Sequence, residues 1–126
     1  MEEQRQEQRA HARKLMREQA YLADAGTTSW APVVLLDISL SGISFASPSA
    51  IIHGELRHLQ FRMPGSPLLH RVRIHIVHHT TAGVPVGFKV GARFEEIGTE
   101  TREAIAGFLV SGDTERESCV KLVKNA

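Results

Sequence analysis

The chain has 126 residues and a formal net charge of +1 at pH 7, and hydrophobic residues make up 42% of it. This length suits one domain with a core of its own. The low net charge excludes a general polyanion-binding surface, so any anion site must come from local clustering. The single cysteine, Cys119, excludes an internal disulfide framework. The polar N-terminus lacks the apolar stretch of a signal peptide, and no window is apolar enough to span a membrane, so we expect a soluble cytoplasmic protein.

Residues 1–18 are polar and rich in helix formers, and we predict that they form an N-terminal arm. Arginine recurs at every fourth position, as Arg5, Arg9, Arg13 and Arg17. If these residues formed a helix, like charges at this spacing would destabilise that helix by ~0.2–0.5 kcal/mol per pair. Solvent screens the repulsion between these arginines, and an anionic ligand bound between them would offset it. The alternative is a frayed, solvated terminus, so the arm alone does not define a site.

Apolar and alternating runs in the next part of the chain predict about six strands joined by short turns. The expected strands cover residues 20–24, 30–37, 43–46, 56–63, 71–76 and 86–95. In most of them apolar and polar residues alternate, which is typical of antiparallel strands with one buried face. The run from Pro32 to Leu36 is apolar throughout and predicts a buried strand. The pattern therefore predicts an antiparallel sheet or a small barrel.

The periodicity changes after residue 98 and predicts a helix. Thr99 can cap its start, and Gly112 is a plausible stop. Apolar residues follow at helical spacing: Ile105, Phe108 and Leu109. We expect this helix to pack on the sheet, where it could close one end of a barrel. Residues 113–126 form a tail or a short last helix, because Thr114 to Glu117 has the form of a capping box.

The stretch Asp37-Ile38-Ser39-Leu40-Ser41-Gly42 separates the apolar run from the alternating residues 43–46. Asp and Ser hydrogen-bond readily to nearby backbone, and Gly permits conformations that other residues avoid, so the composition predicts a turn. A simple hairpin connection is one interpretation. The other is that the turn presents a carboxylate and a hydroxyl group at the rim of the sheet.

Neither catalysis nor a metal site is indicated by the sequence. It contains no Gly-x-Ser-x-Gly elbow, phosphate-binding loop or His-Glu-x-x-His motif. Three histidines lie close together, and on a regular strand His75 and His79 share one face while His78 points to the other. No cysteine or carboxylate falls nearby at ligand spacing, so we interpret these residues as a solvent-facing polar row.

The arginine arm and the Asp-x-Ser-x-x-Gly turn together resemble the PilZ domain, the bacterial receptor module for cyclic di-GMP. That family is marked by Arg-x-x-x-Arg in an N-terminal arm and then by Asp/Asn-x-Ser-x-x-Gly. The chain offers Arg9-Ala10-His11-Ala12-Arg13 and then Asp37 to Gly42, at a separation similar to the family's. Residues 90–94 are similar to the family's Gly-x-x-Phe strand, and the expected helix follows. The resemblance covers residues 9–110.

The resemblance implies a six-stranded antiparallel β-barrel of the PilZ split-barrel type, with a C-terminal helix and a flexible arm that bears arginines. We accordingly divide the chain into a ligand-clasping arm (1–18), a barrel with its helix (19–112) and a tail (113–126). The implied cyclic di-GMP site consists of Arg9, Arg13, Asp37, Ser39 and Gly42, with no metal and no cofactor.

The arginine pattern leaves alternatives open. Arg5/Arg9 and Arg13/Arg17 satisfy the Arg-x-x-x-Arg motif as well as Arg9/Arg13 does, although the interval to the first strand favours Arg9/Arg13. Gln8 stands where many relatives carry a further arginine that grips a second ligand molecule. Arg5 or Arg17 could supply that charge.

The residue types suit this ligand chemically. A guanidinium group can form two parallel hydrogen bonds with guanine O6 and N7 or with phosphate oxygens. The carboxylate of Asp37 can accept from guanine N1–H and from the exocyclic amine, a pattern that adenine does not offer. Ser39 would add a short donor or acceptor, and Gly42 would let the backbone turn sharply or approach the ligand closely.

The preferred interpretation is a receptor that relays ligand binding by a conformational change to a downstream protein, for which pilus, flagellar or exopolysaccharide machinery are options. The alternative is a PilZ-like interaction module that does not bind the nucleotide. General nucleic-acid binding is disfavoured, because aromatic residues make up only 6% of the chain and the net charge is small.

Overall fold

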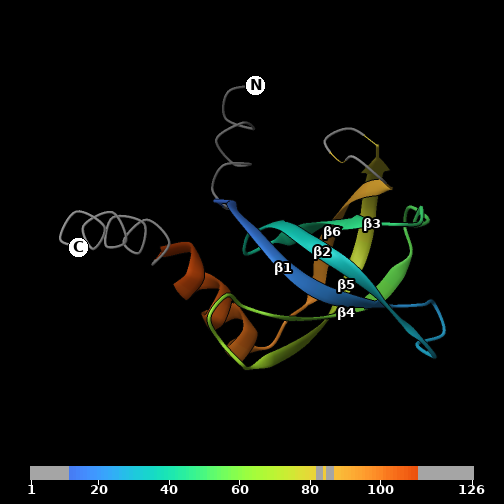
Figure 1. Cartoon of the computed structure of the whole chain (residues 1–126). Coiled ribbons are helices and arrows are strands. Elements are labelled where there is room, and N and C mark those ends of the chain that lie inside the picture. Colours follow the sequence, from blue (N-terminus) through green and yellow to red (C-terminus); the bar gives the residue numbers. More distant parts are fainter. Residues whose placement is uncertain (1–11, 82–83, 85–86, 111–126) are drawn as a thin grey trace, which may run out of the picture.

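Residues 12–81, 84 and 87–110 are described by the computed structural model of the chain. Within these residues six strands form a closed antiparallel barrel in the order β1-β2-β3-β6-β5-β4, with β4 pairing back to β1 (Figure 1). The strands are β1 (Lys14–Ala23), β2 (Trp30–Ile38), β3 (Gly42–Ser47), β4 (Leu56–Arg62), β5 (Leu69–Thr80) and β6 (Phe88–Glu96). The predicted barrel is therefore confirmed.

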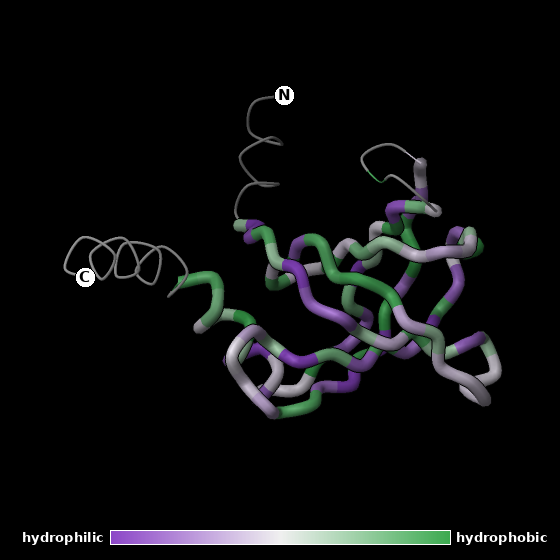
Figure 2. Tube along the Cα trace, in the orientation of Figure 1, coloured by the Kyte–Doolittle hydropathy of each residue, from purple (hydrophilic) through white to green (hydrophobic). Residues whose placement is uncertain are grey.

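The barrel interior is filled by the apolar residues of the alternating pattern. Phe45, Phe61 and Ile74 are among the most deeply buried side chains. The apolar run of β2 stands out as a green segment of the tube beside the more polar β1 (Figure 2). Only alternate residues of that run point inward, because Val34 remains 36% exposed while Leu35 is fully buried. The predicted strand is present, and its apolar burial is on the inner face, since in a single-walled barrel the other face points away from the core.

Strand β1 begins at Lys14 rather than at Ala20, so the expected boundary after residue 18 falls inside it. It pairs with β2 from Lys14 opposite Ile38 to Ala23 opposite Trp30, with a register shift between Leu15 and Glu18. The early part carries mostly polar side chains on its outer face, which concealed its strand character. The chain therefore enters the barrel directly after Arg13.

A bulge in β5 changes the faces on which the histidines lie. The register shifts between Ile76 and His78, so that His78 pairs with Gly91 and His79 pairs with the fully buried Val90. An extra residue reverses the alternation beyond it. His78 therefore lies on the outer face with His75, and the prediction that His75 and His79 share a face was wrong.

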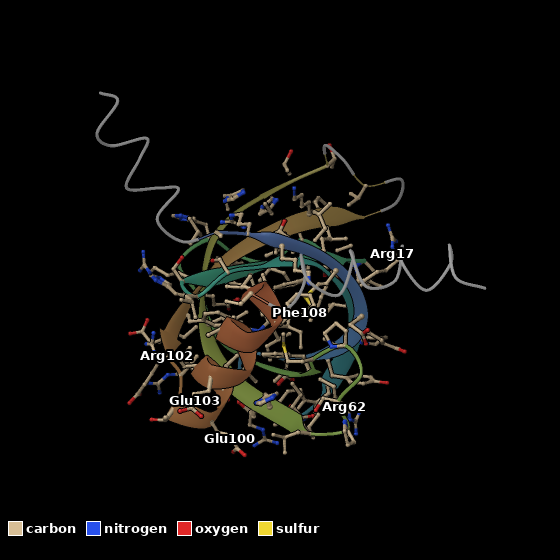
Figure 3. The ribbon with its side chains drawn as sticks, turned by 90° about the vertical axis from the view of Figure 1, so that its left-hand side faces the viewer. Arg17, Arg62, Glu100, Arg102, Glu103 and Phe108 are labelled. Atoms are coloured by element: carbon tan, nitrogen blue, oxygen red, sulfur yellow. The ribbon has the colours of Figure 1, made fainter. Side chains whose placement is uncertain are left out.

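Residues 99–110 form a helix that packs on the barrel on the side where β1 begins (Figures 1 and 3). Its first backbone bond runs from Arg102 N to Gly98 O, which places Gly98 at the cap and the predicted cap Thr99 in the first turn. Ile105 is fully buried in the core, and Phe108 and Leu109 pack against it, as the helical spacing predicts. No helix within the described ranges is long and apolar enough to cross a membrane. The predicted tail, residues 113–126, lies outside those ranges.

The turn between β1 and β2 is organised by Asp24. Its carboxylate accepts hydrogen bonds from the Thr28 hydroxyl and the Thr28 backbone N–H, each at 2.7 Å, and from Ser29. These donors, the Thr28 hydroxyl first, lower the pKa of Asp24 to about 2. A depressed carboxyl pKa stabilises the fold above the unfolded value of 3.8, and that contribution disappears as the pH falls toward 2.

Replacing Thr28 by valine should therefore raise the pKa of Asp24 toward 3.8, because the strongest donor is removed while the shape of the side chain is kept. The measurement is an NMR titration of the Asp24 carboxyl carbon in both proteins. A midpoint that is the same in the two proteins would contradict this assignment of the cause.

Candidate functional site

The register of β1 against β2 brings Arg13 to the Asp-x-Ser-x-x-Gly turn. Leu15 lies opposite Asp37, so the residue just before the strand reaches the end of β2. Arg13 Nη1 donates to Asp37 Oδ1 at 2.6 Å. The Arg13 side chain is 60% exposed, whereas that of Asp37 is 12% exposed. A largely exposed cation thus covers a mostly buried carboxylate in the wall of the barrel.

The second oxygen of Asp37 is held by Ser44 on the neighbouring strand β3. Ser44 Oγ donates to Asp37 Oδ2 at 2.7 Å, and the two residues are opposite each other in the β2–β3 ladder. Ser44 is buried. Ser44 was not among the predicted site residues, although its polar position in the alternation of residues 43–46 indicated that it faces outward, away from the core. Its hydroxyl group orients the carboxylate.

Ser39 shapes the turn from inside. It is 1% exposed, and its Oγ accepts from the backbone N–H groups of Ser41 and Gly42, each at 3.2 Å. The Ser39 backbone N–H in turn donates to the Gly42 carbonyl at 2.9 Å. In this structure the hydroxyl group serves the turn itself, and the part-buried Ser41 hydroxyl lies 3.2 Å from it.

Gly42 is required by close packing of β3 against β6. A Cβ atom placed on it would lie 2.4 Å from the carbonyl oxygen of Ala92, which is backbone and cannot swing away. Its φ is not positive, unlike that of Gly54, Gly65 or Gly87. The special turn conformation considered for this glycine is therefore absent, and the contact that requires a glycine is with the backbone of β6.

The ladders align four residues in one row across the outer face of the barrel. Asp37 pairs with Ser44, Ser44 with Gly91, and Gly91 with His78, so the row crosses β2, β3, β6 and β5. A Cβ atom on Gly91 would lie 2.4 Å from His78 Cε1 and 2.9 and 3.0 Å from the ring nitrogens, so the imidazole occupies the space over the glycine. The row thus ends in an exposed ring.

Arg93, opposite Gly42 in the β3–β6 ladder, adds a second cation beside the turn. Its Nη2 lies 2.8 Å from His75 Nδ1. Because a guanidinium group can only donate, Nδ1 accepts, and the proton on Nε2 is directed at the carbonyl of Gly54 at 3.1 Å. Sequence reasoning did not select Arg93 as a site residue, since pairing across strands is not visible in the chain order.

The structure therefore brings together four of the residues predicted for the site: Arg13, Asp37, Ser39 and Gly42. Arg5 and Arg9 lie outside the described residues. Arg17 is exposed on β1, two positions beyond Leu15 on the outer face (Figure 3). Among the residues with described positions, no group of three or more histidine, cysteine or acidic side chains could hold a metal ion.

Replacing Gly42 by alanine should lower the free energy of unfolding by roughly 1–3 kcal/mol, because the added methyl group meets the backbone of β6. The matched control is Gly107→Ala, which adds the same atom in open space on the helix and should stabilise by roughly 0.5–1 kcal/mol. Urea denaturation of both variants measures the difference. Equal effects of the two substitutions would contradict the close-approach argument.

Comparison with known proteins gives a family match and structural neighbours. The model of the PilZ domain family matches residues 3–111. No curated protein sequence matches the chain. Among solved structures, the Bacillus subtilis inhibitor of motility (MotI/DgrA) is similar with a TM-score of 0.72 at 14% identity, over 85% of this chain and 51% of its own. YcgR from Escherichia coli, solved in complex with c-di-GMP, has a TM-score of 0.71 at 16% identity, over 94% of this chain and 50% of its own.

A third neighbour is MrkH of K. pneumonia, solved as a c-di-GMP complex, with a TM-score of 0.66 at 14% identity, over 87% of this chain and 54% of its own. At these identities the similarity shows the shared fold. The chain spans about half the length of these three proteins.

Proposed function

The chain belongs to the PilZ domain family, and we propose that it is a receptor for cyclic di-GMP. The observation that carries the proposal is the 2.6 Å ion pair between Arg13 and Asp37, which joins the arginine motif to the Asp-x-Ser-x-x-Gly turn. Two similar structures, YcgR and MrkH, contain c-di-GMP, which supports the choice of ligand.

The ion pair is suited to exchange for a ligand. Because Arg13 is largely exposed, its pairing with Asp37 contributes only about 0.2–1 kcal/mol. Two bonds from a guanidinium group to guanine or to a phosphate replace it readily. Asp37, released from Arg13 and still oriented by Ser44, then accepts from N1–H and the exocyclic amine of a guanine.

The outer face beside the turn offers an aromatic and a cationic group to the ligand. The exposed ring of His78, which covers Gly91, supplies an aromatic surface at the end of the row. Arg93 lies opposite Gly42 and adds a positive charge for the ligand's phosphates. In this proposal Ser39 maintains the conformation of the turn. Arg9, in the N-terminal arm, contacts the ligand together with Arg13.

The protein acts as a receptor, and the bound state is passed to a protein partner. Closure of the arm over the ligand would change the surface that the partner meets. A folded protein that takes up no nucleotide would instead be a PilZ-like interaction module.

Replacing Arg13 or Asp37 by alanine should each weaken cyclic di-GMP binding at least about tenfold, the effect of losing one charge-assisted contact. The measurement is isothermal titration calorimetry, with cyclic di-AMP and GTP as specificity controls. Arg62→Ala is the matched control, because Arg62 lies on β4 and donates to the carbonyl of Pro67 instead. Both site variants binding like wild type would show that the site is assigned wrongly.

The same titration decides which arginine accompanies Arg13. We expect Arg9→Ala to weaken binding at least about tenfold by the same loss of a charge-assisted contact and Arg17→Ala to leave it nearly unchanged. The physical reason is that Arg17 is part of strand β1, within its register shift, whereas Arg9 precedes the strand. The reverse order of effects would assign the Arg13/Arg17 pair.

A further inference from the structure

We propose that Lys14 couples the cyclic di-GMP site to the end of the C-terminal helix, so that ligand binding at Arg13 releases that end. The inference rests on the proposed function for the identity of the ligand. It concerns a contact that lies apart from the turn and the arginine motif. Four residues carry it: Arg13, Lys14, Asp37 and Phe108.

Lys14 holds the end of the helix by two contacts. Its Nζ lies 3.9 Å from the centre of the Phe108 ring and donates to the Phe108 backbone carbonyl at 3.2 Å. A cation over a ring face and at the carbonyl end of a helix is favourable on both counts. Lys14 is the first residue of β1, so the helix end is tied to the point where the chain enters the barrel.

The start of the helix is anchored differently. Thr101 Oγ1 lies 2.9 Å from Nδ1 of the buried His70 on β5, and the His70 ring packs 5.5 Å from that of Phe61. This attachment involves the buried His70 and does not involve residues of the turn. Figure 3 shows the helix across the barrel, with Glu100 at one end and Phe108 toward the other. The helix can therefore loosen at Phe108 while it stays anchored at Thr101.

The beginning of β1 is set off from the rest of the strand by irregular pairing. Register shifts occur between Leu15 and Glu18 in the β1–β2 ladder and between Leu35 and Asp37 in the β2–β3 ladder. Irregularities of this kind interrupt a ladder and allow the strand beyond them to bend. Successive residues of a strand point to opposite faces, so Arg13 reaches out to Asp37 while Lys14 reaches toward the helix.

These contacts stabilise one closed state of the ligand-free protein. When the ligand draws Arg13 away from Asp37, the strand end shifts and Lys14 withdraws from Phe108. The side chains of Phe108 and Leu109, which pack against the core, then become available to a partner. Because linkage is reciprocal, weakening the Lys14–Phe108 contact must strengthen ligand binding.

The first test is calorimetry of cyclic di-GMP binding to Phe108→Leu, which removes the ring without changing any charge. We expect about fivefold tighter binding than wild type, at the lower end of typical couplings. Val110→Ala, on an exposed position of the same helix, is the control and should bind like wild type. Unchanged or weaker binding to Phe108→Leu would overturn the inference.

The second test needs no ligand. Arg13→Gln should speed hydrogen exchange of the amides at residues 104–110, because the strand end loses its attachment to Asp37. Arg17→Gln removes the same charge farther along β1 and should not. Equal exchange in the two variants would overturn the coupling. If wild type binds no cyclic di-GMP, the receptor function fails, and this second test still decides whether Arg13 and the helix are coupled.

Discussion

The carboxylate of Asp37 is the constraint on which the site depends. It lies in the wall of the barrel, where Ser44 holds one oxygen and Arg13 covers the other. A carboxylate that is mostly shielded from water needs such partners. The pairings of β2 with its two neighbours supply them, one from each side. The register of the barrel strands therefore places Arg13 and Ser44 beside Asp37, and the turn completes the site.

Much of the fold was predictable because alternation reports burial directly. The runs that became β3, β4 and β6 and the helical spacing of Ile105, Phe108 and Leu109 all carried a clear signal. The turn from Asp37 to Gly42 was also predictable, because it depends on residue types at fixed spacing. The ion pair between Arg13 and Asp37 was not predicted, since both residues were expected to contact the ligand.

The remaining features depend on contacts that composition does not encode. The bulge that moves His79 to the other face of β5 leaves no mark in a run of similar polar residues. The first residues of β1 are strand because β2 pairs with them, although their own side chains are polar. Ser44 and Arg93 became visible as neighbours of the turn once the ladders were known. Pairing partners are the information that a single sequence lacks.

Closure of the barrel also determines where a signal can travel. Every strand has a hydrogen-bonded neighbour on both sides, so no strand slides without breaking two ladders at once. We therefore expect the strands of the wall to move little relative to one another. Movement costs the least free energy at the rim of the barrel. The chain enters there, and the turn and the end of the helix lie there. A movement that follows the proposed ligand binding would therefore be confined to the rim and would leave the core unchanged.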